Sequence, residues 1–284
     1  MSGFFFAALT AVFFGLQSSY SKYAAKDLSY LALTTATICS ALPVLLAYLF
    51  YSGIPDVDVQ PFLLATFTSY AFNLFAFPLF FRAIVVSPLY LTMPFTAFTP
   101  LFLIPVAWLT LGELPDRSGL AGILMIIGGV YVIYLRGDWL SPFRSLLNEP
   151  GSRYMLLVAV LWSVSGTVEK NAVLASSAAF YGTAVHVMLA ISFVAYMAFK
   201  QPKELKKIRL HPRTLIILSL ISGSLVICQL TALTLLQVSY VLSFKRGGIL
   251  ISIFLGYLFF REPNPVKNLA GGAIIVAGAI LMMI

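Results

Sequence analysis

The stretch SYVLSFKRGGILISIFLGYLFF, residues 239–260, is long and apolar enough to cross a bilayer as an α-helix. It carries Lys245 and Arg246 about a third of the way along, although a cation at the centre of a membrane helix costs about 2.5–3.5 kcal/mol on insertion scales. Two arrangements could offset the charges. The pair could face a water-filled site that receives an anion, or it could be held by a structural ion pair or by backbone carbonyls. The anion site is favoured, because no acidic residue lies at a similar depth in an obvious partner segment.

The composition of the whole chain excludes a soluble globule. Of its 284 residues, 60% are hydrophobic and 10% are charged, against roughly 25% charged in a soluble domain. Only helices or closed barrels satisfy the backbone inside lipid, and windows of about 20 apolar residues recur along the chain. The sequence therefore predicts an all-α, multi-pass integral membrane protein whose surroundings are the lipid bilayer.

Ten windows meet this description, and short connections rich in Gly, Pro and acidic residues separate many of them. The predicted spans are Gly3–Ala24, Tyr30–Tyr51, Pro61–Phe81, Pro88–Leu111, Gly119–Leu135, Tyr154–Leu174, Phe180–Phe199, Thr214–Leu236, Ser239–Phe260 and Val266–Ile284.

The charges between these spans predict an orientation. Thirteen basic residues fall on one side of the membrane, whereas Arg117 is the single basic residue of the connections on the other side. The positive-inside rule places the basic side in the cytoplasm and both termini outside, most simply in the plasma membrane. The net charge of +8 is thus a topology signal and an attraction to anionic lipids, with no reason to invoke nucleic acid. The basic-side residues are Lys26, Arg82, Arg136, Arg144, Arg153, Lys200, Lys203, Lys206, Lys207, Arg209, Arg213, Arg261 and Lys267.

The chain also repeats itself. Leu111-Gly112-Glu113 corresponds to Phe260-Arg261-Glu262 at a shift of 149, the difference between positions 113 and 262. Ala11-Val12-Phe13-Phe14 corresponds to Ala159-Val160-Leu161-Trp162 at a shift of 148, the difference between positions 11 and 159. Five helices per unit is an odd number, so the second unit must enter the membrane with the opposite orientation. This predicts two inverted five-helix repeats, residues 1–136 and 153–284, joined by a loop over 137–152, as in many secondary transporters.

Helix-weakening residues recur in the fourth helix of each repeat. Pro88, Pro94, Pro100 and Pro105 punctuate the first, and Gly247-Gly248 follows the basic pair in the second. Both helices are expected to kink where a pathway between the repeats needs polar backbone or a hinge.

The last helix of each repeat has two glycines seven residues apart. Gly122 and Gly129 correspond to Gly271 and Gly278, and each pair lies on one helix face. Such small residues allow close helix contacts, and packing inside one chain is favoured over a dimer seam.

These features together resemble the drug/metabolite transporter superfamily with its two EamA-type repeats. Lys245-Arg246 and the following FFREPNP, residues 259–265, are similar to the Lys-Arg element of triose-phosphate and nucleotide-sugar translocators, whose pair binds substrate phosphate. Where those translocators carry another basic residue in the fourth helix, this sequence has Thr96 or Met93, so a carboxylate is expected as well as a phosphate.

Other polar side chains at membrane depth are candidates for lining the pathway, and for each amide an interhelical hydrogen bond is the equal alternative. A solitary His186 is more often a packing residue than a proton carrier. With Lys245 and Arg246, the candidates are Gln17, Tyr20, Asn73, Thr96, His186, Gln229 and Tyr240.

No catalytic, metal or cofactor constellation is visible in the sequence. The two histidines, His186 and His211, lack Asp or Glu neighbours, the two cysteines form no metal motif, and no Gly-rich phosphate loop occurs. The sequence predicts a secondary transporter of a small anionic metabolite, working by alternating access as a monomer or homodimer. The alternative is an exporter of amino acids or other zwitterionic or neutral metabolites.

Overall fold

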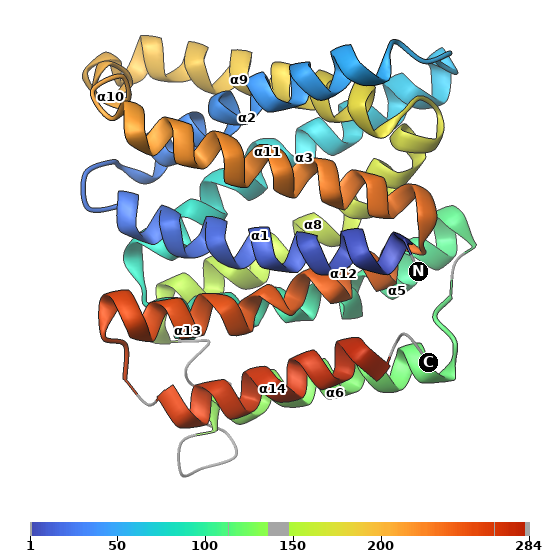
Figure 1. Cartoon of the computed structure of the whole chain (residues 1–284), viewed down its shortest axis with the longest axis vertical. Helices are drawn as coiled ribbons and strands as arrows, with labels where there is room; N and C mark the ends of the chain where they lie inside the picture. The colour runs from blue at the N-terminus through green and yellow to red at the C-terminus, as the bar shows by residue number, and fades with distance from the viewer. Residues whose placement is uncertain (1, 113, 136–147, 264, 282–284) are drawn as a thin grey trace.

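The computed structural model describes residues 2–112, 114–135, 148–263 and 265–281, and these residues form helices without a strand. Most of the helices lie side by side across the long axis of the molecule (Figure 1). They are α1 (Ser2–Ala24), α2 (Tyr30–Ser52), α3 (Val59–Val86), α4 (Leu89–Thr92), η1 (Met93–Phe98), α5 (Thr99–Leu111), α6 (Arg117–Tyr134), α8 (Pro150–Leu174), α9 (Ala178–Lys200), α10 (Pro202–Ile208), α11 (Pro212–Leu235), α12 (Val238–Arg246), α13 (Gly248–Phe260) and α14 (Pro265–Leu281).

Seven helices or helix runs of the described chain are long and apolar enough to cross a membrane. The apolar parts of α6 and α14, Arg117–Ile133 and Val266–Gly278, are shorter, and α8 carries three charges, Arg153, Glu169 and Lys170. Every predicted span overlaps a described helix, but ten crossings remain a prediction. The helix α3 continues beyond the predicted end at Phe81, so Arg82 lies inside it and not in a connection.

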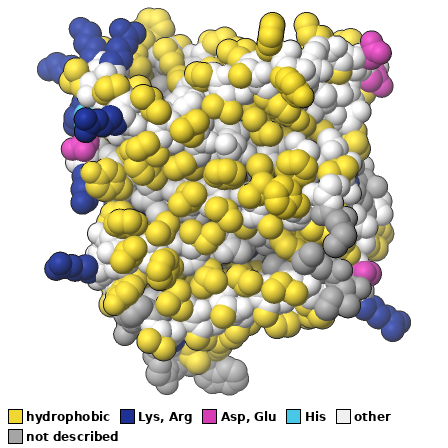
Figure 2. Space-filling model, viewed as in Figure 1, with side chains coloured by type: hydrophobic (Ala, Val, Ile, Leu, Met, Phe, Trp, Pro, Cys, Tyr) yellow, Lys and Arg dark blue, Asp and Glu magenta, His cyan; other side chains and the backbone are white. Residues whose placement is uncertain are grey.

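The two ends of the helix layer carry different charges. Figure 2 shows Lys and Arg gathered along one edge of the molecule, whereas the acidic groups lie mainly along the other edge with one basic group near them. The start of α1 and the end of α14 lie at the edge away from the basic groups (Figures 1 and 2). Between the two edges, the visible face is largely hydrophobic, as expected where lipid chains cover it.

Contacts in one half of the chain are matched by contacts in the other. The helix α1 packs along α11, and α8 packs along α3. Gln17 of α1 donates to the hydroxyl of Ser222 at 2.8 Å, and Asn73 donates to Ser165 of α8 at 2.6 Å. Each pair is related to the other by the repeat shift of 148 or 149 residues.

Two lysines at matched positions of the repeat donate hydrogen bonds to carbonyl groups at the ends of α3 and α11. The Nζ of Lys22 donates to the carbonyls of Ile84 and Ser87 at 2.7 and 2.8 Å, and Lys170 donates to the carbonyl of Leu236 at 2.9 Å. The last carbonyls of a helix lack intrahelical partners, and a cation is favoured beside them. These side chains therefore join helices within each half.

The predicted weak points in the fourth helix of each repeat are confirmed. In the first repeat this helix is divided into α4, the 3₁₀ segment η1 and α5. In the second, it is interrupted at Gly247, between α12 and α13. The backbone N–H groups of Leu89 and Tyr90, at the start of α4, donate to the carboxylate of Glu262 at 2.8 and 3.1 Å.

Helix α1 crosses directly over the joint between α12 and α13. A Cβ atom on Gly248 would lie 2.3 Å from the carbonyl oxygen of Ala11, and one on Gly15 would lie 2.7 Å from the carbonyl oxygen of Gly248. Only residues without a Cβ allow two backbones to approach this closely.

The glycines of α6 and α14 pack these two helices against each other, which confirms packing within one chain. A Cβ on Gly129 would lie 2.6 Å from the carbonyl oxygen of Gly271, and one on Gly278 would lie 2.5 Å from that of Gly122. The pair lies side by side at one end of the layer (Figure 1).

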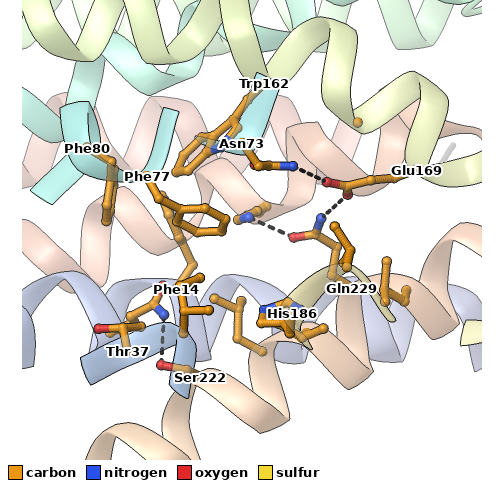
Figure 3. Close-up of a pocket in the computed structure, with 18 of the residues that line it drawn as sticks. Phe14, Thr37, Asn73, Phe77, Phe80, Trp162, Glu169, His186, Ser222 and Gln229 are labelled. Carbon is orange, nitrogen blue, oxygen red and sulfur yellow. Dashed lines mark hydrogen bonds between the residues drawn. The ribbon is translucent and has the colours of Figure 1, made fainter. Parts of the chain in front are cut away.

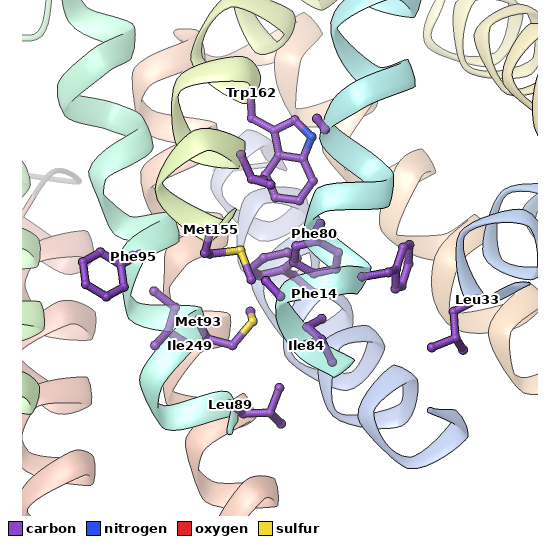
Figure 4. Packing of buried hydrophobic residues seen from close by; sticks show 14 of the residues in the cluster. Phe14, Leu33, Phe80, Ile84, Leu89, Met93, Phe95, Met155, Trp162 and Ile249 are labelled. Carbon is purple, nitrogen blue, oxygen red and sulfur yellow. The ribbon is translucent and has the colours of Figure 1, made fainter. Parts of the chain in front are cut away.

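A cluster of buried aromatic and aliphatic side chains holds the two halves together (Figure 4). Phe14 of α1, Phe80 of α3 and Trp162 of α8 have ring centroids 5.1 to 6.3 Å apart. Aromatic pairs in this range contribute about 0.5–1.5 kcal/mol beyond their buried area. Because Phe14 and Trp162 occupy matched positions of the repeat, the cluster lies where the two halves meet.

Candidate functional site

A cavity of about 80 Å³ lies between helices of both halves, beside the aromatic cluster. Side chains from α1, α2, α3, α8, α9, α11 and α12 line it, and Figure 3 shows them pointing inward. Its lining combines aromatic rings with convergent polar groups, the usual make-up of a small-molecule site. The volume has room for a few water molecules.

Lys245 is tied to an acidic residue through an amide. Its Nζ donates to Oε1 of Gln229 at 2.7 Å, and Nε2 of Gln229 donates to Oε2 of Glu169 at 3.0 Å, as Figure 3 shows for the amide and the carboxylate. The expectation that no acidic residue lies at the depth of the basic pair is therefore wrong. Glu169 lies at that depth because α8 passes beside α11 and α12.

The carboxylate of Glu169 accepts hydrogen bonds from several side chains. The hydroxyl of Ser165 donates to it at 3.0 Å and Nδ2 of Asn73 at 3.4 Å. One signal in the sequence could have placed it: Trp162, Ser165 and Glu169 are spaced so that they share one face of a helix. Its neighbour Lys170 points elsewhere, toward the end of α11.

Arg246 is the fully buried cation of the site. Its side chain is 0% exposed, and its Nε and Nη1 groups have no hydrogen-bond partner within the described part of the chain. Each buried N–H group without a partner costs about 1–3 kcal/mol. The arrangement therefore has unused capacity to donate to an oxygen atom.

The two aromatic rings at matched positions also contact both cations. The Nζ of Lys245 lies 5.0 Å from the ring centroid of Phe14 and 5.1 Å from that of Trp162. The guanidinium carbon of Arg246 lies 5.5 and 5.8 Å from the same centroids. Cation–π contacts of this kind contribute about 0.5–2 kcal/mol each, so the rings offset part of the cost of burying the charges.

The structure brings six of the predicted site residues together along the cavity: Gln17, Asn73, His186, Gln229, Lys245 and Arg246. Gln17 and Asn73 each make an interhelical hydrogen bond as well. These two amides therefore both line the cavity and join helices. Nδ1 of His186 lies 2.8 Å from the carbonyl oxygen of Gly182, the preceding turn of its own helix.

Three predicted site residues do not line this cavity. Tyr20 packs against Tyr23 near the end of α1, and the hydroxyl of Thr96 donates to the carbonyl of Met93 within η1. The ring of Tyr240 lies against Gly119, at the start of α6. Thr96 is nevertheless fully buried in the interrupted fourth helix.

Among the described residues, no group of three His, Cys, Asp or Glu side chains is arranged to hold a metal ion. Cys39 and Cys228 are free thiols on different helices. The chemistry of the cavity is therefore that of its cations, its carboxylate, its amides and its aromatic rings.

Comparison with known proteins assigns the two halves of the chain to the same family profile. The profile of the EamA-like transporter family matches residues 1–135 and again residues 150–284. A solved structure titled "Crystal structure of protein" has the same fold, with a TM-score of 0.70 over 97% of this chain and 95% of that one, at 16% identity. No curated protein matches the sequence.

Proposed function

This chain belongs to the EamA-like transporter family, and from that premise we propose that it moves a small anionic metabolite across a membrane by alternating access. The substrate would be an organic phosphate or a carboxylate, because these groups present the oxygen atoms that a buried cation recognises. The protein is accordingly a membrane transporter of the drug/metabolite type, with the cavity between the halves as its substrate site.

The observation that carries the proposal is the state of Arg246. Its guanidinium is completely buried beside the cavity, and its Nε and Nη1 donors lack partners among the described residues. Lys245, by contrast, is already engaged by Gln229. Arg246 would therefore bind the anion directly, while Lys245 would add positive potential and hold the amide in place.

Alternating access is supported by the matched contacts of the two halves. Exchanging the repeats turns the pair α1 and α11 into the pair α8 and α3, and both pairs are in contact. Five-helix units related in this way would be inverted with respect to each other. A cavity of about 80 Å³ is smaller than a typical ligand pocket, so a metabolite would enter when the halves move apart.

The test is transport by the purified chain in proteoliposomes, using phosphorylated sugars, di- and tricarboxylates and amino acids as candidate substrates. Arg246→Gln should reduce uptake of the best anion by about tenfold or more, the equivalent of about 1.4 kcal/mol. Arg117→Gln, an exposed arginine at the start of α6, is the matched control and should transport normally. Full anion transport by the folded Arg246→Gln protein would contradict the proposal.

A second substrate class, zwitterionic amino acids, is favoured by the position of Glu169. Its carboxylate lines the same cavity as Arg246, so the site offers one group for a carboxylate and another for an ammonium. In that case, the amino acid would replace part of the hydrogen-bond network in which Gln229 now connects Lys245 to Glu169.

Glu169→Gln separates the two substrate classes. The glutamine keeps the size of the side chain and one acceptor oxygen, which can accept from Ser165 or from Gln229, but it removes the negative charge. Uptake of a pure anion should be kept or increased, because a like charge has been removed from the cavity. Uptake of an amino acid should fall by about tenfold or more.

A further inference from the structure

A second hollow lies on the outer surface of the helix layer, away from the central cavity. It is a groove of about 630 Å³ between α2, α9, α10 and α11, and it shares no lining residue with the cavity. Most of its lining is apolar, and Ile216 and Leu220 on its wall are 62% and 60% exposed. Because these side chains face outward from the layer, they would meet lipid chains in a membrane.

The groove has a direction. It begins at Arg209, beside the connection between α9 and α11, and it extends along α2 from Thr35 to Pro43. Thr35 and Pro43 are eight residues apart, so this part of the groove is about 12 Å long at 1.5 Å per residue. One leaflet of the hydrocarbon core is about 15 Å thick, so the groove extends over most of a single leaflet.

The outer end of the groove is strongly basic. Residues 200–213 contain six cations and one carboxylate, that of Glu204. Leu205 and Ile208 of α10 line the groove, while Lys203 and Lys206 on the same short helix are exposed. Figure 2 shows this cluster of basic side chains at the corner where Figure 1 places α10. The six cations are Lys200, Lys203, Lys206, Lys207, Arg209 and Arg213.

The basic charge is unevenly distributed among the connections. The matching connection in the first half, between α2 and α3, contains Asp56 and Asp58 and no Lys or Arg. In an inverted repeat that connection lies on the opposite side, so its lack of cations follows the positive-inside rule. Six of the thirteen basic residues assigned to the basic side nevertheless fall in the one connection over residues 200–213, where headgroups border the groove.

We propose that this groove is a binding site for an anionic phospholipid, with one acyl chain between α2 and α11 and the headgroup phosphate held by Arg209 and Lys207. An apolar channel that extends over most of one leaflet and ends in a cluster of cations is complementary to a lipid with a negatively charged headgroup. Zwitterionic lipids share the acyl chain but lack the net charge, so they should bind less well.

The test uses the full chain in detergent micelles supplemented with phosphatidylglycerol or with phosphatidylcholine of the same acyl chains. Phosphatidylglycerol should raise the melting temperature, and more so at higher concentration, because a ligand that binds only the folded state stabilises it. Phosphatidylcholine should raise the melting temperature less. Glycerol phosphate, which has the anionic group without the acyl chains, should leave it unchanged.

Three variants locate the effect. The double variant Lys207→Gln and Arg209→Gln should lose the difference between the two lipids, whereas Arg117→Gln, at the start of α6 on the opposite edge (Figure 1), should keep it. Arg246→Gln should also keep it, since the cavity and the groove are separate. Equal effects of the two lipids on the wild type, an undiminished difference in the double variant, or a full effect of glycerol phosphate would each overturn the proposal.

Cys39 provides an independent readout because its partly exposed thiol lines the groove. In a Cys228→Ala background, phosphatidylglycerol should slow the reaction of Cys39 with a membrane-permeant maleimide severalfold more than phosphatidylcholine does. An equal labelling rate in the two lipids would show that the groove does not select an anionic lipid.

Discussion

At the scale of single residues, the central feature is a set of charged side chains whose burial inside a membrane would be unfavourable without partners. Lys245 and Glu169 are connected by Gln229, whereas Nε and Nη1 of Arg246 have no hydrogen-bond partner among the described residues. A buried polar network is stabilising only when its members are satisfied, and removing one member leaves the others exposed to the full cost of burial. The amide of Gln229 is the member on which both charged groups depend.

Gln229→Leu should therefore destabilise the protein more than any exposed Gln→Leu exchange. Leucine has a similar size, but it leaves Lys245 without the 2.7 Å bond and Glu169 without the 3.0 Å bond. Each lost bond to a charged group corresponds to about 1.5–3 kcal/mol. The melting temperature in detergent measures the effect, with the exposed Gln60→Leu as control. Equal melting temperatures for the two variants would show that the network contributes little to stability.

The sequence predicted one half of this network and missed the other. A pair of cations in an apolar span is conspicuous because its cost is large and local, so Lys245 and Arg246 could be identified without a structure. Glu169 lies five residues before Leu174, the end of the predicted helix Tyr154–Leu174. Whether it meets Lys245 depends on the rotation and crossing of two helices far apart in the chain, which no local pattern fixes.

At the scale of elements, the ends of corresponding helices have the same geometry but different residues. Gly112, after α5, and Arg261, after α13, both adopt left-handed backbone conformations, with φ of 67° and 53°. Glycine adopts this conformation without strain, whereas a residue with a Cβ atom loses about 1–2 kcal/mol there. The first half thus has the favourable residue at this turn and the second half does not.

Arg261→Gly should raise the stability of the protein by about 1 kcal/mol, less the entropy that glycine gains in the unfolded chain. The reciprocal exchange Gly112→Arg should lower it by a similar amount, because it creates the same strain in the first half. Chemical or thermal unfolding in detergent measures both. A destabilised Arg261→Gly protein would mean that the arginine side chain contributes more than its backbone costs.

At the scale of the whole molecule, two halves that match the same family profile pack against each other, and the sequence predicted part of this arrangement. The spacing of Gly122 from Gly129 and of Gly271 from Gly278 indicated close contacts, and the structure brings the two pairs together. The order of packing across the layer could not be predicted, because helices in lipid lack the polar and apolar faces that orient helices in water.

Two adjacent glycines of α6 test the contact with α14. A Cβ on Gly129 would meet the backbone of Gly271 at 2.6 Å, whereas a Cβ on Gly128 would meet nothing within 4 Å. Gly129→Ala should destabilise the protein by about 1–3 kcal/mol, because it forces the helices apart. Gly128→Ala should be neutral or slightly stabilising. Similar melting temperatures for the two variants would contradict close packing of α6 against α14.

The charges at the two edges predict the orientation of the molecule in its membrane. A reporter that is active only outside the cytoplasm should be active when fused after Ile284 and inactive when fused to a chain that ends at Lys200, on the basic side. The opposite pattern would place both termini in the cytoplasm and would mean that the basic edge does not set the topology.

The contact of Gly15 with Gly248 has a mechanical consequence. Because the two backbones touch there, α13 cannot swing about Gly247 unless α1 shifts with it. Phe14 and Gln17, on either side of Gly15, form part of the cavity wall. A bend between α12 and α13 would therefore move α1, and with it Phe14 and Gln17. Opening of the helices at this joint and a change in the shape of the cavity would occur as one concerted motion.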